Sequence, residues 1–219
     1  MWTNPIRTFV RKGNIGIAKA AYRNMVIPVY RAAGIPVYDI TASWELGYTW
    51  FRIPKNGTHS IMQLLSGVRM PDINSSAVPY FRRRHASQYK FCVIRNPWDR
   101  LVSVYCNKVL MELMYPECWG RDFGYFIGFI SKLDLGQCDN HIRLQTAMFP
   151  VTDMNFVGRM EQFEDNLRHI MKTVFNDPVE IPHLGVVAHE NYRTYYDTKT
   201  RQAVSDLYAS DIAFGNYVF

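Results

Sequence analysis

The sequence predicts an α/β protein, a single domain with a central, mostly parallel sheet flanked by helices. Apolar runs typical of strands alternate along the chain with segments whose apolar residues recur at helical spacing, as in parallel α/β sheets. Two of these runs end in a short polar loop that opens a helix. The length of 219 residues and the 48% hydrophobic content suit one domain, residues 1–219, with a sizeable core.

The first 40 residues are expected to form a basic helical extension packed on this core. Basic and apolar residues alternate through residues 1–31, and their spacing allows an amphipathic helix interrupted near residues 13–16. A basic amphipathic segment can lie on a membrane surface, but the modest apolar face favours packing against the domain's own sheet. Residues 34–39 predict a turn and a short extended segment.

The chain is organised around residues 48–65, YTWFRIPKNGTHSIMQLL. Aromatic and β-branched residues predict a buried strand that Pro54 ends, and a helix begins near Thr58. Gly57 lets the backbone turn close to a ligand. The unpaired N–H groups at the start of this helix, together with the charge of Lys55, make an anion site. We interpret the loop as a cradle for phosphate or sulfate, although P-K-N-G is also common turn chemistry.

A second strand, turn and helix are predicted in residues 89–110, YKFCVIRNPWDRLVSVYCNKVL. Pro97 suits the first turn of the helix, where its missing N–H costs nothing. Arg95 stands at the carboxyl end of the strand, and Ser103 follows eight positions later. Ligands bind at the carboxyl ends of parallel strands in open α/β sheets, so Arg95 can make bidentate hydrogen bonds to a phosphate that Ser103 also reaches.

The same patterns predict the remaining helices, strands and loops. Residues 70–79 are rich in turn formers and predict a loop, and the basic cluster at residues 82–84 precedes the second strand. Aromatic residues at helical spacing predict a helix within residues 118–136. A short strand at residues 154–157, a helix at 161–174 and a final helix at 198–208 complete the prediction.

Together, PKNGTHS and RNPWDRLVSVY resemble the two cofactor motifs of the sulfotransferases, specifically the Golgi carbohydrate type and its small bacterial or viral relatives. The resemblance continues weakly through residues 139–141, 156–161 and 208–219, and so covers residues 48–219. It implies a P-loop-like architecture, shared with nucleotide kinases. It also implies that 3′-phosphoadenosine 5′-phosphosulfate is the donor and adenosine 3′,5′-bisphosphate the product, with no metal ion.

The resemblance also implies roles for individual residues. The first loop would hold the 5′-phosphosulfate, with Lys55 as a catalytic residue at the bridging oxygen, and the second motif would hold the 3′-phosphate. This assigns cofactor binding to Lys55, Asn56, Gly57, Thr58, His59, Ser60, Arg95 and Ser103. Sulfuryl transfer, like phosphoryl transfer, depends on positioning and charge stabilisation rather than on covalent work by the protein.

The acceptor hydroxyl needs a general base, for which histidine is suited near neutral pH. His85 is the first choice because it precedes the strand that ends at Arg95, as the histidine base does in several relatives. His141, in a segment resembling the family's Asp-x-His, is the second choice and is otherwise expected to bind the acceptor.

The net charge and the cysteine content limit which classes of ligand and partner the protein is expected to bind. The net charge of +6 suits an anionic ligand, though it also suits nucleic acid or a membrane. The four cysteines show no metal-ligand spacing, and whether Cys118 and Cys138 pair is left open. We expect a small-molecule donor and a carbohydrate acceptor as partners, and neither nucleic acid nor a transmembrane segment. The sequence favours no particular oligomeric state.

No run reaches the roughly eighteen apolar residues of a membrane span. Golgi members of the resembled family carry an N-terminal membrane helix. We therefore expect a cytoplasmic, soluble microbial or viral enzyme, unless the chain has been separated from such an anchor. Three alternatives remain: a basic nucleic-acid-binding module using residues 82–84 and Arg95, a P-loop kinase, and a cofactor-binding protein without catalysis. The missing G-K-[ST] disfavours the kinase.

Overall fold

The computed structural model describes residues 22–68, 70–176 and 191–219. Its five-stranded sheet has the order β3-β1-β2-β4-β5. The strands are β1 (Val37–Ser43), β2 (Tyr48–Phe51), β3 (Ile73–Pro79), β4 (Tyr89–Ile94) and β5 (Phe156–Arg159). Strands β2, β4 and β5 are parallel, whereas β1 is antiparallel to both β2 and β3. The α/β prediction is confirmed; the sheet is mixed because a short turn joins β1 to β2 as a hairpin.

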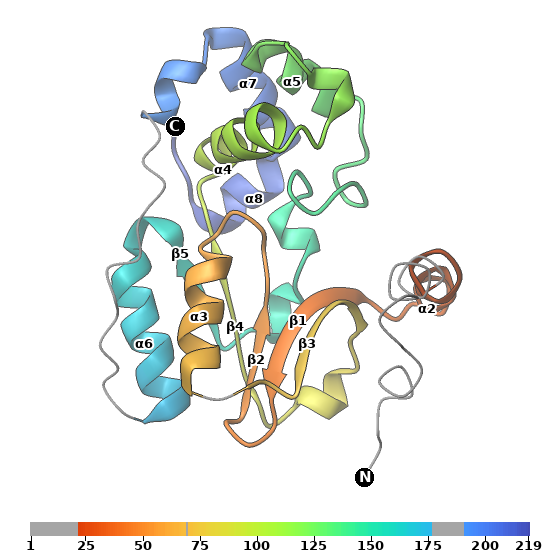
Figure 1. Cartoon of the computed structure of the whole chain (residues 1–219), viewed down its shortest axis with the longest axis vertical. Coiled ribbons are helices and arrows are strands. Elements are labelled where there is room, and N and C mark those ends of the chain that lie inside the picture. The colour runs from red at the N-terminus through yellow and green to blue at the C-terminus, as the bar shows by residue number, and fades with distance from the viewer. Residues whose placement is uncertain (1–21, 69, 177–190) are drawn as a thin grey trace.

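Helices lie against one face of the sheet and beyond the carboxyl ends of its parallel strands (Figure 1). On one face, α3 (Thr58–Val68) and α6 (Phe163–Phe175) bury a cluster that includes Trp50, Phe91 and Leu65. The opposite cluster, which includes Phe51 and Leu101, extends beneath α4 (Pro97–Val104), α5 (Phe123–Ile130) and α7 (Thr198–Leu207). Figure 1 shows α4, α5, α7 and α8 (Ala209–Gly215) gathered beyond the carboxyl ends of the parallel strands. Those ends are therefore enclosed on several sides.

Short helical segments connect these elements. Helix α2 (Ile27–Ala32) follows the π-helical turn η1 (Tyr22–Val26), and α4 continues directly into a π-helix, η3 (Tyr105–Met111). The 3₁₀ turns are η2 (Arg82–His85), η4 (Pro116–Cys118), η5 (Gln145–Ala147), η6 (Val151–Asp153), η7 (Met160–Gln162) and η8 (Tyr192–Tyr195). Most of the amphipathic helix expected in residues 1–31 lies outside the described residues.

The prediction of a loop at residues 70–79 is wrong, because most of this segment forms the edge strand β3. Residues 74–76 are exposed, so the strand lacks the apolar alternation that identifies a half-buried strand. A register shift between Tyr38 and Ile40 of β1 and a positive φ of 56° at Ala77 further break its regularity. Irregularity of this kind is common at sheet edges.

The parallel pairing of β2 with β4 places the two predicted motifs side by side. Trp50 of β2 pairs with Phe91 of β4, so the loops that follow the two strands leave the sheet at neighbouring points. Asn96 then caps α4, its side chain accepting a hydrogen bond from the Trp98 N–H at 3.1 Å. The candidate site is built where these loops meet.

Candidate active site

The cradle loop has the backbone geometry of a tight turn into a helix. Lys55 and Gly57 both adopt a φ of 72°, in the left-handed region. A Cβ at Gly57 would lie 2.3 Å from the ring of Phe163, so both conformation and packing require glycine there. The first helical bond of α3 runs from the Ile61 N–H to the Gly57 carbonyl at 3.0 Å. The preceding amides have no intrahelical acceptor, and helix starts with such free amides favour anions.

The side chains of this loop divide between structural and exposed positions. The Thr58 hydroxyl donates to the Ile53 carbonyl at 3.0 Å and so closes the turn. His59 is exposed and Ser60 is half-buried. The first turn of α3 contains no acidic residue that would compete for its amides. The backbone, rather than the ring of His59, is the group that this geometry offers to an anion.

Lys55 is held in place by the π-helix. Its ammonium donates to Oδ1 of Asn107 at 2.7 Å. Burial, followed by repulsion from Lys108 and Arg95, lowers the pKa of Lys55 to about 8. An anionic ligand would relieve this repulsion, because an opposite charge favours the protonated amine.

Arg95 joins the second motif to the cradle. Its guanidinium is buried, donating from Nη1 to the Lys55 carbonyl at 3.0 Å and from Nε to Oδ2 of Asp99 at 2.7 Å. Ser103 lies one turn of α4 beyond Asp99, on the same face of the helix, and is half-buried. The structure therefore brings Arg95 to Lys55 and aligns Ser103 along the helix that Arg95 precedes.

Gln145 clamps the two loops together from a third segment. Its side chain accepts from the Arg95 N–H at 3.0 Å and donates to the Arg95 carbonyl at 2.9 Å. The same Oε1 accepts from Nδ2 of Asn56 at 2.7 Å. Asp211, itself buried, accepts from the Gln145 N–H at 2.7 Å. Asn56 thus anchors the cradle to the sheet, and its Oδ1 is buried without a partner among the described residues.

Arg100 connects the cradle to the segment that carries His141. It is 1% exposed, and its guanidinium donates to the carbonyls of Pro54 at 3.3 Å, Asn140 at 2.8 Å and Arg143 at 2.8 Å. The carbonyls of Pro54 and Asn140 therefore lie against one rigid group. The residues that follow them, Lys55 and His141, start from adjacent points.

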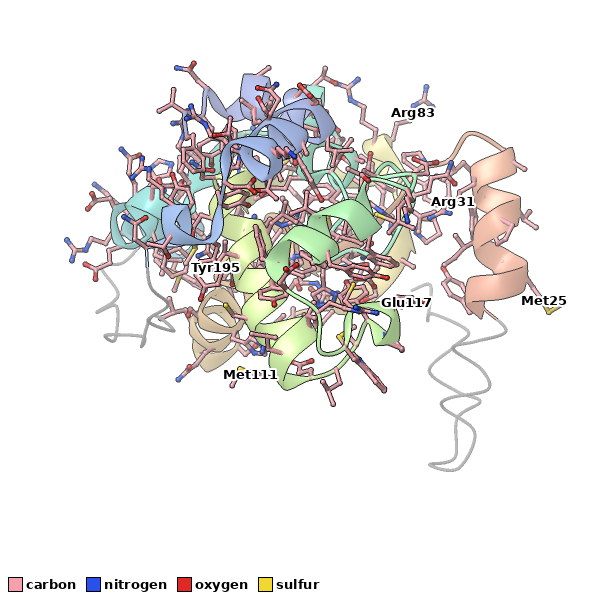
Figure 2. The ribbon with its side chains drawn as sticks, turned by 90° about the horizontal axis from the view of Figure 1, so that it is seen from above. Met25, Arg31, Arg83, Met111, Glu117 and Tyr195 are labelled. Carbon is pink, nitrogen blue, oxygen red and sulfur yellow. The ribbon has the colours of Figure 1, made fainter. Side chains whose placement is uncertain are left out.

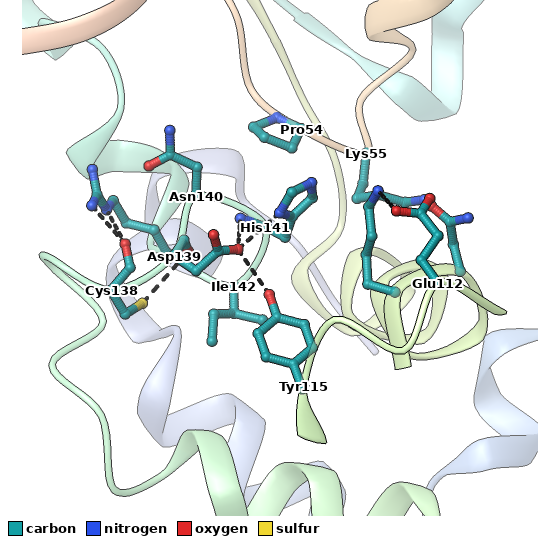
Figure 3. Close-up of polar contacts among 12 residues, drawn as sticks. Pro54, Lys55, Glu112, Tyr115, Cys138, Asp139, Asn140, His141 and Ile142 are labelled. Carbon is teal, nitrogen blue, oxygen red and sulfur yellow. Dashed lines mark hydrogen bonds and ion pairs between the residues drawn. The ribbon is translucent and has the colours of Figure 1, made fainter. Parts of the chain in front are cut away.

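His141 lies in a hydrogen-bonded chain at this junction (Figure 3). Its Nδ1 is 2.8 Å from Oδ1 of Asp139, which also accepts from the Tyr115 hydroxyl at 2.8 Å. Partial burial would raise the pKa of Asp139, but the hydrogen bonds from His141 and Tyr115 outweigh it and hold that pKa below its usual range. Figure 3 shows His141 on the side of Asp139 that faces Pro54 and Lys55. A carboxylate on Nδ1 leaves Nε2 for another proton partner.

Glu112 completes the charged groups around Lys55. Its carboxylate pairs with Lys108, a turn earlier on the π-helix, and this hydrogen bond lowers the pKa of Glu112. Lys108 is thereby paired with a carboxylate, whereas the Lys55 ammonium bonds to the neutral amide of Asn107. Glu112 also lies close enough to His141 and Lys55 to interact with their charges.

The structure does not bring His85 to the cradle. His85 is 2% exposed and precedes β4, whereas Arg95 follows it, and a six-residue strand spans about 20 Å. Its Nδ1 lies 2.9 Å from the Thr49 hydroxyl and 3.0 Å from Oε1 of Gln88. Burial lowers its pKa. The predicted role of His85 as base is therefore not supported by its position.

The basic cluster beside His85 is also remote from the cradle. Arg82 pairs with Asp153 at 2.8 Å, and Arg84 lies over the ring of Trp44. Arg83 projects from the surface (Figure 2). These side chains belong to the amino end of β4, away from the ends at which the two motifs meet.

A cavity of about 380 Å³ opens beside Arg95 at the carboxyl ends of β4 and β5. Its wall includes two arginines with flat aromatic partners: Arg159 lies over Tyr217, and Arg193 lies over Tyr192. The lining residues are Asn96, Asp99, Arg159, Glu161, Gln162, Tyr192, Arg193, Asn216, Tyr217 and Val218. Its volume is in the range of ligand pockets.

Three further features bear on the sequence predictions. Cys92, Cys106, Cys118 and Cys138 are free thiols. Within residues 22–68, 70–176 and 191–219, no group of three His, Cys, Asp or Glu side chains is arranged to hold a metal ion. In the same part of the chain, no helix combines the length and apolarity needed to cross a bilayer.

Several site residues escaped the sequence prediction. Arg100 and Asn107 lie inside the second motif and its continuation, where an arginine on an otherwise apolar helix face was a usable signal. Gln145 and Tyr115 belong to segments without a recognisable pattern. Their roles depend on contacts across 50 and 24 residues, which periodicity does not report.

Comparison with known proteins agrees with this geometry. Neither the curated proteins nor the solved structures yielded a match to the chain. The model of the sulfotransferase family matches residues 16–217, which include both motifs, the Gln145 clamp and the His141 segment. Because this match spans nearly the whole chain, the protein belongs to the sulfotransferase family.

Proposed function

We propose that this sulfotransferase moves the sulfuryl group of 3′-phosphoadenosine 5′-phosphosulfate to a hydroxyl of a carbohydrate. One observation carries the proposal: buried Arg100 holds the cradle and the His141 segment against each other. This supports a site in which the Lys55 ammonium and the His141 imidazole, a group suited to proton transfer, act together at the start of a helix that favours anions. Transfer between two bound oxygens depends on such positioning of the reacting groups.

The residues present fit such a donor. The amides at the start of α3 and the Lys55 ammonium suit the 5′-phosphosulfate, because the first turn of α3 holds no acidic residue and the ammonium bonds to the neutral amide of Asn107. Arg95 and Ser103 are proposed to hold the 3′-phosphate, and the neighbouring cavity has room for the adenosine. Its arginines and tyrosines suit an anionic, aromatic ligand.

The chemistry assigned to the chain is proton transfer and charge stabilisation. The bound donor supplies the electrophilic sulfur. His141 accepts the proton of the acceptor hydroxyl at Nε2 as the new O–S bond forms, with Asp139 holding the ring from Nδ1. Lys55 stabilises the negative charge that grows on the bridging oxygen as the old S–O bond breaks. That oxygen leaves with the phosphate, so the products are a sulfate ester and adenosine 3′,5′-bisphosphate.

Calorimetric titration with adenosine 3′,5′-bisphosphate tests the donor site. We expect micromolar binding by the wild type and at least tenfold weaker binding of 5′-AMP, because the 3′-phosphate adds charge-assisted hydrogen bonds. Ser103→Ala should weaken binding of the bisphosphate and leave the affinity for 5′-AMP unchanged. It is preferred to Arg95→Ala as first variant because Arg95 also supports the loop. Equal affinity for both nucleotides would contradict the donor assignment.

Comparison of two histidine variants tests the base. His141→Ala should lower kcat by about 10²- to 10⁴-fold while the bisphosphate still binds, since general-base catalysis contributes on that scale. His85→Asn is the matched control, because His85 is buried about one strand length from the cradle. Initial rates of sulfate transfer measure both. A larger kcat loss in folded His85→Asn than in His141→Ala would reverse the assignment.

A further inference from the structure

An exposed apolar surface borders the candidate site. Between residues 110 and 119, Met111 is 74% exposed, Leu110 52% and Trp119 50%. We call the surface formed by Leu110, Met111, Leu113, Met114 and Trp119 the apolar lip. The segment folds back on itself, since the Met114 N–H donates to the Lys108 carbonyl at 2.8 Å and the Trp119 indole to the Leu113 carbonyl at 2.9 Å. Contiguous exposed apolar side chains of this kind mark binding surfaces.

The apolar lip is continuous with the reacting groups. The same stretch of chain supplies Asn107 to Lys55, Glu112 to Lys108 and Tyr115 to Asp139. Met111 and Leu113 flank Glu112 directly. Figure 3 shows Glu112 and Tyr115, which belong to the same stretch of chain as the lip, beside Lys55 and Asp139.

The charges around the lip oppose a polyanionic acceptor. Residues 110–119 contain two carboxylates, Glu112 and Glu117, and no basic side chain. Glu112 is paired with Lys108, and the exposed Arg121 follows two positions after Trp119. The dense basic cluster is elsewhere: Figure 2 shows Met111 and Arg83 on opposite edges of the molecule. An uncharged acceptor with an apolar part meets complementary groups here, whereas a sulfated or carboxylated polysaccharide meets carboxylates.

We propose that the acceptor is a neutral glycoside with an apolar aglycone, and that the aglycone rests on the apolar lip while the sugar hydroxyl reaches His141. This inference rests on the proposed function, which it deepens by naming the acceptor class. It predicts that affinity grows with the length of the alkyl chain, because each buried methylene adds favourable transfer free energy.

Saturation-transfer NMR on the protein loaded with adenosine 3′,5′-bisphosphate tests the inference. The probes are octyl β-D-galactopyranoside below its micelle concentration, methyl β-D-galactopyranoside, and chondroitin as polyanion. We expect the octyl glycoside to bind at least about tenfold more tightly than the methyl glycoside. Met111→Glu should abolish that difference. Met70→Glu is the matched control, since Met70 is 76% exposed near the far end of α3.

Each other outcome overturns the inference. The two glycosides could bind equally or not at all, or chondroitin could bind more tightly than the octyl glycoside. Met70→Glu could also lose the preference for the octyl glycoside as fully as Met111→Glu does. A change of oligomeric state in Met111→Glu, measured by sedimentation, would assign the lip to a second copy of the chain instead. Failure of the donor proposal is separately visible, because the bisphosphate would then not bind in the calorimetric titration.

Discussion

Replacing Lys55 with methionine is expected to lower kcat for sulfuryl transfer by about 10²- to 10³-fold, the usual effect of removing one preorganised charge stabiliser. The pH dependence should follow the same group. Burial and the nearby cations lower the pKa of Lys55 to about 8, so the free enzyme loses the ammonium as pH rises through that value. We expect kcat/KM to fall above about pH 8, and kcat to fall only at higher pH, because the anionic donor favours the protonated amine.

Lys132→Met is the control for this variant, since Lys132 is exposed on the turn after α5. It should leave both rate and pH profile unchanged. A Glu112→Gln variant sharpens the test, because the Glu112 charge raises the pKa of Lys55 and its removal should move the fall in kcat/KM to lower pH. An unchanged alkaline limb in both Lys55→Met and Glu112→Gln would show that another group titrates there.

Replacing Arg100 with leucine is expected to give the largest loss of stability. Three carbonyls, of Pro54, Asn140 and Arg143, lose their donor in a buried site. Since each buried unsatisfied acceptor costs about 1–3 kcal/mol, we expect a loss of about 3–5 kcal/mol in the free energy of unfolding. Urea denaturation measures it.

Two further variants separate stability from positioning. Arg83→Leu, on the exposed surface, should change stability by less than about 0.5 kcal/mol. Arg100→Lys keeps the charge but not the planar fork that spans three carbonyls. If it folds, its kcat should fall while bisphosphate binding persists, because the cradle and the His141 segment are no longer fixed to each other. Wild-type kcat in folded Arg100→Lys would refute the positioning role.

The sequence predicted those parts of the fold that produce local patterns. Residues 48–65 carry an aromatic strand, a turn and an apolar helix face, and the structure contains β2, the cradle loop and α3 there. The strand β3 was missed because its burial is set by the partner β1 and not by its own alternation. The antiparallel pairing of β1 was likewise hidden, since nothing in its composition distinguishes it from a parallel strand.

The candidate site was predictable only where it follows directly from a strand end. Lys55 and Arg95 come together because β2 and β4 are parallel neighbours, as their motifs suggested. The predicted role of His85 lost support because the residue precedes β4, whereas the cradle lies at the opposite end of that strand. Conversely, the His141 segment is fixed to the cradle by Arg100, whose partners Pro54 and Asn140 are 46 and 40 residues away from it in the sequence.

The Gln145 clamp bears on when the enzyme acquires its ligand site during folding. Its hydrogen bonds join residues 50 positions apart, to Arg95, and 89 positions apart, to Asn56. Loops of this length close late in folding, because the chain loses conformational entropy before the stabilising contacts form. A partly folded chain that has formed only its local hairpin and helices thus has not yet assembled the candidate site. A nucleotide that binds only the native state would stabilise that state, and would slow proteolysis through the open state by the factor 1 + [L]/Kd, where [L] is the free nucleotide concentration.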